Sequence, residues 1–145
     1  MTTVLTQTIA RLLLPPAFVV AVAVMVKGYA DTGDGFSAGV IAGLGVLLQY
    51  VAFGYRVAER LVTIRTAARA MVAGLLLALV VTFAPLLRGD PILTHVPEPG
   101  AHVTHLGTLE LITAVAFDVG VFLIVFGFAV GSIGMVARTV DRSVP

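Results

Sequence analysis

The feature that most constrains this chain is the run from Phe36 to Tyr55, which contains no charged residue. A helix needs about 20 mostly apolar residues to cross the hydrocarbon core of a bilayer, and this run has that length. The whole chain shares the bias: 59% of its 145 residues are hydrophobic and 12% are charged, whereas soluble domains carry about 25% charged residues. A soluble core of this size could not bury so many apolar side chains, so the sequence predicts that the bilayer is the solvent.

Further long apolar runs extend this prediction to the whole chain. We expect an all-α integral membrane protein with four transmembrane helices, which form a single membrane domain over residues 1–145. Strands of a membrane barrel would alternate apolar and polar residues, and these runs do not. The expected spans are residues 12–30, 36–55, 70–87 and 107–137.

The first run could be mistaken for a signal peptide. Pro15 and Pro16 interrupt it, and no small-x-small cleavage site precedes Lys27. Both features argue against removal, so we expect this segment to remain as a membrane span.

The positive charges predict an orientation. With four spans, the N-terminus, the segment between the second and third spans, and the C-terminus share one side of the membrane. The positive-inside rule then places both termini in the cytoplasm, with residues 31–35 and 88–106 outside. The inner side would hold seven of the nine Lys and Arg residues: Arg11, Arg56, Arg60, Arg65, Arg69, Arg138 and Arg142.

Composition also excludes several classes of function. The chain has no cysteine, which excludes disulfides, thiol catalysis and cysteine-based metal sites. A net charge of +1 provides no basic stripe for nucleic acid. No nucleophile–base pair, phosphate-binding loop or dinucleotide motif is present, so we expect neither an enzyme nor a bound cofactor.

Small residues recur at helical spacing in several spans. Gly35, Gly39 and Gly43 are each four residues apart, and such positions share one helix face. A helix face without large side chains lets another helix approach closely, as in small-xxx-small packing. The stripes could pack the spans of this chain together, or they could pack against other subunits. Similar stripes are Gly127 with Gly131, and Ala70 with Gly74 and Ala78.

The acidic, glycine-rich segment before the second span, Asp31-Thr-Gly-Asp-Gly35, has two interpretations. A calcium loop would need oxygen ligands at positions where this chain has Gly33 and Ala42. A tight turn that places acids at a helix N-terminus is the simpler interpretation. Asp34 is also a candidate for an ion-facing group at the outer mouth.

Asp118 is the costliest residue of the fourth span to bury, because ionisable groups within membranes usually face a protein interior or a water path. Its depth depends on where the span begins. It could lie at the outer interface, with Glu110 on an extension of the helix, or about 10 Å inward. Asp118, Asp34 and Glu110 are therefore our candidates for an ion pathway, with a capped or interfacial structural role for Asp118 as the alternative.

Three histidines, His95, His102 and His105, lie in the outer loop with Glu98. Zinc would need three or four convergent ligands. A solvated loop is the more economical interpretation, and we expect no metal site.

Two segments resemble those of a known family. Gly33-Asp-Gly35-Phe36, followed by Gly39, resembles a glycine-rich segment of the MrpB/MnhB subunits of Mrp-type Na+/H+ antiporters. Phe117-Asp118, followed by Gly120 and Val121, resembles the motif in that family's fourth span. This chain departs from the first motif at two positions, because Thr32 replaces a proline and Asp34 replaces a glycine.

The resemblance covers nearly the whole chain and implies a function. Such proteins are small subunits of a multisubunit antiporter in the prokaryotic cell membrane, which exchanges internal Na+ for external H+. The implied partners are the A, C, D, E, F and G subunits, with Na+ and H+ as cargo and no cofactor. A role in assembly and cation translocation is implied for this chain. Our hypothesis is that the acidic, glycine-rich segment before the second span acts as a hinge, which places Phe36 and the glycine stripe against neighbouring subunits.

Three alternatives stay open from the sequence. The chain could be the B-like subunit of a related respiratory hydrogenase-type complex, or a purely structural assembly subunit. It could also be a small membrane protein or enzyme that acts alone.

Overall fold

The computed structural model describes residues 3–27, 34–94, 105–106, 109–110 and 113–143. In that part of the chain, four helices are long and apolar enough to cross a membrane. They are α1 (Val4–Lys27), α2 (Asp34–Phe53), α4 (Val62–Phe83) and α5 (Thr113–Ser143). The short elements described are the helix α3 (Tyr55–Ala58), the 3-10 helix η1 (Ala84–Arg88) and the paired strands β1 (His105–Leu106) and β2 (Leu109–Glu110). The prediction of a helical membrane architecture is confirmed, with the two-residue strands as a small addition.

The helix boundaries differ from the expected spans because helices continue past charged residues. α1 begins at Val4, so Arg11 lies within it, and α5 runs to Ser143, beyond Arg138. A long arginine side chain can reach polar surroundings from a helix that stays regular. α5 starts at Thr113, later than the expected residue 107, because β2 occupies residues Leu109–Glu110.

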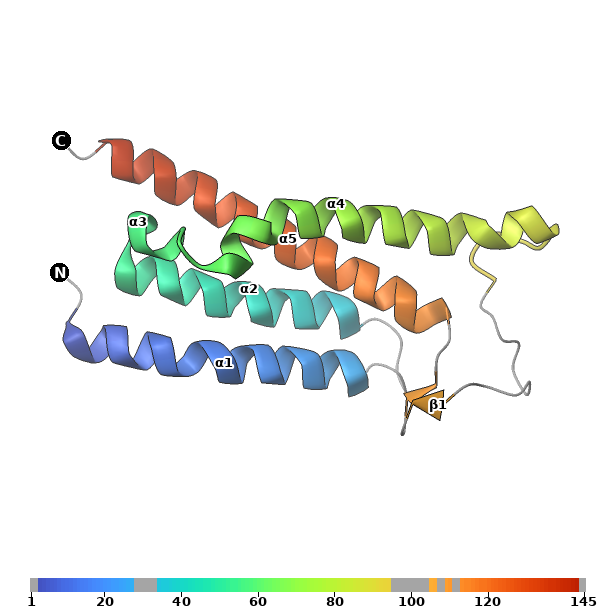
Figure 1. Ribbon diagram of the computed structural model, residues 1–145, viewed down its shortest axis with the longest axis horizontal. Helices are drawn as coiled ribbons and strands as arrows, with labels where there is room; N and C mark the ends of the chain where they lie inside the picture. Colours follow the sequence, from blue (N-terminus) through green and yellow to red (C-terminus); the bar gives the residue numbers. More distant parts are fainter. Residues whose placement is uncertain (1–2, 28–33, 95–104, 107–108, 111–112, 144–145) are drawn as a thin grey trace.

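The long helices form one bundle in which α1 packs on α2, α2 packs on α5, and α5 packs on α4 (Figure 1). α2 and α5 run in the same direction, whereas α4 runs opposite to α5. Both chain termini lie at the same end of the bundle, together with α3. We call this the arginine end, and we call the opposite end, where α2 and α5 begin, the hinge end.

Side-chain size is distributed as expected for helices packed in lipid. The buried residues of α1 and α2 are mostly small, such as Ala10, Ala38 and Ala42, while large side chains such as Leu44 point outward. Close packing of small residues drives helix association in membranes, where apolar burial gives little net gain. The exposed apolar surface is therefore the surface that lipid or other subunits cover.

Glycines on both helices bring α5 close to α4. On the α4 side, a Cβ built on Gly74 would lie 2.6 Å from the carbonyl oxygen of Gly120 and 2.6 Å from the Cβ of Leu123. A Cβ on Gly127 would lie 2.6 Å from the Cβ of Met71. Any side chain at Gly74 or Gly127 would push α4 away from α5.

α1 docks on α2 through a glycine and a buried amide. A Cβ on Gly45 would lie 3.1 Å from the Cβ of Ala17. One helical turn further, the buried Gln49 donates from Nε2 to the carbonyl oxygen of Ala10 at 2.7 Å and to that of Gly45 at 3.4 Å. The amide is thus paired with backbone, as a polar group inside a membrane bundle must be.

The break between α2 and α3 requires a glycine. Gly54 has a φ of 77°, a left-handed conformation that residues with a Cβ rarely adopt. This turn ends α2 and directs α3 across the arginine end of the bundle, which positions the arginines described below.

Candidate functional site

The two sequence motifs meet at the hinge end. Gly35, in the first turn of α2, lies so close to α5 that a Cβ there would collide with the backbone carbonyl of Asp118. Four residues later, a Cβ on Gly39 would lie 3.1 Å from the carbonyl oxygen of Phe122 and 2.8 Å from the Cβ of Val125. Segments some 80 residues apart in the sequence therefore make one interface, which fixes the start of α2 against the second turn of α5.

This geometry corrects the hypothesis that the glycine stripe faces neighbouring subunits. Gly35, Gly39 and Gly43 are all buried against α5 of the same chain, with Gly43 opposite Ala129. Phe36 differs, because 58% of it is exposed on the outer surface of α2. Among the described residues of the first motif that match the family, Phe36 is therefore the exposed one, whereas Gly33 lies outside the described residues.

Asp118 lies in the second turn of α5, and its depth in the membrane stays a prediction. It is five residues after Thr113, the first residue of α5, which corresponds to about 7.5 Å along the helix. The residue is half-buried, as are Phe117 and Val121, while Gly120 is buried against Gly74 and Ala78 of α4. Among the described residues, no Lys, Arg or His nitrogen lies within 4 Å of its carboxylate.

Asp34 lies at the same end of the bundle as Asp118. It is the first residue of α2 and is half-buried. A carboxylate in the first turn interacts favourably with the positive end of the helix dipole. Asp34 and Gly35 are adjacent, and Gly35 touches the backbone of Asp118, so both acids belong to the same end of the bundle.

Glu110 is not part of the helix that carries Asp118. The expectation of a helical extension is wrong, because Glu110 belongs to β2 and is paired with His105 of β1. Among the described residues, no group of three potential metal ligands comes together. His95, His102 and Glu98 lie outside the described residues.

The arginine end contains polar pairs that the sequence analysis did not single out. Tyr50 of α2 donates its hydroxyl hydrogen to Oε1 of Glu59 at 3.0 Å. A Cβ on Gly134 of α5 would lie 3.0 Å from that hydroxyl oxygen, so the glycine makes room for the pair. These residues line a cleft of about 290 Å³ that Tyr55 and Arg138 also border. The available signal was Glu59 itself, which is the one acid in an arginine-rich segment.

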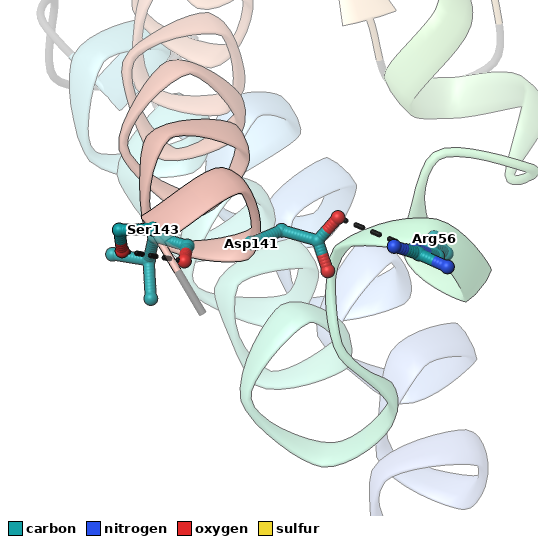
Figure 2. A network of polar contacts seen from close by, with 4 residues as sticks. Arg56, Asp141 and Ser143 are labelled. Carbon is teal, nitrogen blue, oxygen red and sulfur yellow. Dashed lines mark hydrogen bonds and ion pairs between the residues drawn. The ribbon is translucent and has the colours of Figure 1, made fainter. Parts of the chain in front are cut away.

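A second polar pair ties α3 to the end of α5. Nε of Arg56 lies 3.2 Å from Oδ2 of Asp141, and Figure 2 shows the two side chains pointing toward each other across the gap between these helices. Beside Asp141, α2 and α5 border an apolar groove of about 670 Å³ lined by residues such as Leu47, Val51 and Val136. The helices that are in backbone contact at the hinge end therefore leave a groove between them here.

A family model and known proteins match this chain over most of its length. A family model described as a domain related to the MnhB subunit of the Na+/H+ antiporter matches residues 5–131. The chain is 32% identical to a protein of Alkalihalophilus pseudofirmus that is named as the B subunit of a Na(+)/H(+) antiporter, over 93% of this chain and 92% of that protein.

Two further relatives carry similar names. A Bacillus subtilis protein, also named as the B subunit of a Na(+)/H(+) antiporter, is 34% identical over 70% of this chain and 69% of its own length. A Rhizobium meliloti protein, named as the A/B subunit of a probable K(+)/H(+) antiporter, is 33% identical over 84% of this chain, which corresponds to 12% of that longer protein.

Proposed function

Since this chain belongs to the family of MnhB-related subunits of the Na+/H+ antiporter, it is a small multi-pass membrane subunit of an antiporter complex, and we propose that it supports both assembly and cation translocation. The observation that carries this proposal is the family match over residues 5–131, which includes both motifs and the interface between them. In this scheme Na+ and H+ are cargo, and the chain needs no cofactor and performs no chemistry of its own.

We propose that both termini face the cytoplasm. Both lie at the arginine end (Figure 1), and the positive-inside rule assigns an arginine-rich end to the inner side. The hinge end, with Asp34 and Asp118, would then face outward. Cysteines introduced at Ser143 and Asp90 test this orientation, because only the outward one should react with a membrane-impermeant maleimide in intact cells.

The proposed partners are the A, C, D, E, F and G subunits of the complex. The longer Rhizobium meliloti relative, whose name joins the letters A and B, supports a place beside an A-type subunit. Phe36 and the outward apolar side chains of α1 and α4 supply surface for such contacts. Purification of the complex through a tag at Pro145 should recover these subunits, whereas hydrogenase-type soluble subunits would favour the related respiratory complex. Recovery of the chain alone would favour a membrane protein that acts by itself.

We propose that Asp118 and Asp34, with Glu110 as a further acid of the outer side, attract the cation at the hinge end. Support comes from the contact of Gly35 with the backbone of Asp118 and from the lack of a basic partner within 4 Å among the described residues. An unpaired carboxylate that is half removed from water lowers the energy of a nearby cation more than a fully hydrated one does.

The substitution Asp118→Asn tests this role. We expect exchange in membrane vesicles to fall by roughly tenfold, equivalent to about 1.4 kcal/mol of lost attraction for the cation, while the complex stays assembled. Asp141→Asn is the matched control, because it makes the same change on the same helix at the other end. Measurements with Na+ and with K+ identify the cation that this complex prefers. Unchanged exchange in an intact Asp118→Asn complex would favour the purely structural role.

A further inference from the structure

A third pocket at the arginine end lies between α1, α2 and α3, on the far side of α2 from α5. Its volume is about 390 Å³. Arginines from two different segments border it: Arg11 from the third turn of α1, and Arg60 from the turn after α3. The rest of the lining is mainly apolar and includes Leu14, Phe53 and Val57. Figure 1 shows that α1 and α2 lie side by side at this end of the bundle.

The two arginines are not neutralised by acids of the described chain. The ion pair found among the described residues joins Arg56 to Asp141, and no carboxylate of that part of the chain lies within 4 Å of the guanidinium group of Arg11 or Arg60. Arg11 is instead held in place by an aromatic ring, since its Cζ lies 4.9 Å from the centroid of Phe53. This cation–π contact orients a positive charge at the border of the pocket but leaves its hydrogen-bond donors available.

The other polar group of the pocket is already satisfied. Gln49 also borders the pocket, but its Nε2 donates to the backbone of α1 and α2. Recognition of a polar ligand therefore falls to the two guanidinium groups. Planar guanidinium groups suit phosphate, to which they donate two parallel hydrogen bonds.

We propose that this pocket binds an anionic phospholipid. Its headgroup phosphate would lie between Arg11 and Arg60, and an acyl chain would lie against Leu14 and Val57. Basic pockets between membrane helices are suited to anionic lipid headgroups. The apolar lining favours a lipid over a free phosphate ion, because the ion would leave that surface without a partner. This inference needs only the membrane location of the chain and is independent of the role of Asp118.

The test compares lipid binding by whole purified complexes. Wild type and the double variant Arg11→Gln with Arg60→Gln are reconstituted in phosphatidylcholine nanodiscs that contain a minor fraction of cardiolipin. Native mass spectrometry then measures the cardiolipin retained on the complex. Two arginine contacts, each worth about a factor of five, predict retention roughly tenfold to thirtyfold weaker in the double variant. The control double variant, Arg65→Gln with Arg142→Gln, removes the same charge without altering the pocket and should retain cardiolipin.

Several outcomes would overturn the proposal. Equal retention by wild type and the pocket variant would exclude the site, and so would equal losses in both double variants. Displacement of the retained cardiolipin by an equal concentration of inorganic phosphate would identify an ion site instead. Loss of a partner protein, rather than of lipid, would show that a protein fills the pocket. If the pocket variant does not assemble, a photoactivatable phosphatidylglycerol applied to the wild-type complex should label peptides that contain Leu14 or Val57, and labelling confined to α4 and α5 would contradict the proposal.

Discussion

The two ends of the α2–α5 pair are built in opposite ways. At the hinge end, Gly35 and Gly39 let the backbones of these helices touch. At the arginine end, α2 and α5 border an apolar groove, and the polar contacts are made by long side chains such as Tyr50 and Asp141. Backbone contact depends on the absence of a side chain, whereas contacts through long side chains can adjust by rotation. The hinge end should therefore be rigid and intolerant of substitution, and the arginine end should tolerate change.

The largest expected effect comes from adding one methyl group at the hinge end. Gly35→Ala places a Cβ against the backbone carbonyl of Asp118, which no side-chain rotation can relieve. Overpacking of this kind costs about 1–3 kcal/mol even where side chains can adjust, so we expect the amount of assembled complex in membranes to fall severely. Immunoblots of the membrane fraction and of the purified complex measure the loss.

Gly131→Ala is the matched control for this prediction. Gly131 also lies within a long helix, but a Cβ there would meet nothing within 4 Å. Its assembly should equal wild type or exceed it slightly, because alanine favours a helix more than glycine does. Similar losses in both variants would show that the comparison between the two ends is wrong.

A smaller effect is expected from Tyr50→Phe. The substitution removes the hydrogen bond to Glu59 and leaves the ring packed in the core cluster with Phe126 and Val130. A hydrogen bond to a charged group contributes about 1.5–3 kcal/mol where it is shielded from water and less at a partly open cleft. We expect a modest decrease in the thermal stability of the purified complex, with exchange retained.

The control for Tyr50→Phe is Tyr55→Phe, because Tyr55 borders the same cleft and its hydroxyl makes no hydrogen bond with the described residues. The control should leave thermal stability unchanged. If Tyr50→Phe abolished exchange without changing stability, the Tyr50–Glu59 pair would be part of the ion route and the arginine end would be more than a tolerant region.

The sequence predicted the helices far better than it predicted their partners. Long uncharged runs such as Phe36–Tyr55 identify membrane spans by length and apolarity alone. The spacing of Gly35, Gly39 and Gly43 identified a contact face, but a stripe contains no information about which helix covers it. That choice depends on the matching surface of α5, where Phe122, Val125 and Ala129 fill the bare face.

The candidate site shows the same division between local pattern and tertiary arrangement. Asp34 and Asp118 could be selected from the sequence because charges are rare in apolar runs. The two acids lie at the same end of the bundle because α2 and α5 run in the same direction (Figure 1). This direction results from α4, which lies between α2 and α5 in the sequence and runs the opposite way. Glu110 was misassigned to the helix because two-residue strands carry no periodic signal. The pair of Tyr50 with Glu59 was missed because it depends on the turn at Gly54.

The smallest effect is expected for the exposed ion pair between Arg56 and Asp141. The Arg56 side chain is 82% exposed, and exposed pairs contribute roughly 0–1 kcal/mol because water and salt screen them. Arg56→Gln should therefore leave assembly and exchange unchanged, with at most a slight loss of thermal stability that disappears at high salt. A double-mutant cycle with Asp141→Asn isolates the pair from other effects of either change. A coupling well above 1 kcal/mol that persists at high salt would mean that this pair holds α3 against α5, and the arginine end would then be as constrained as the hinge end.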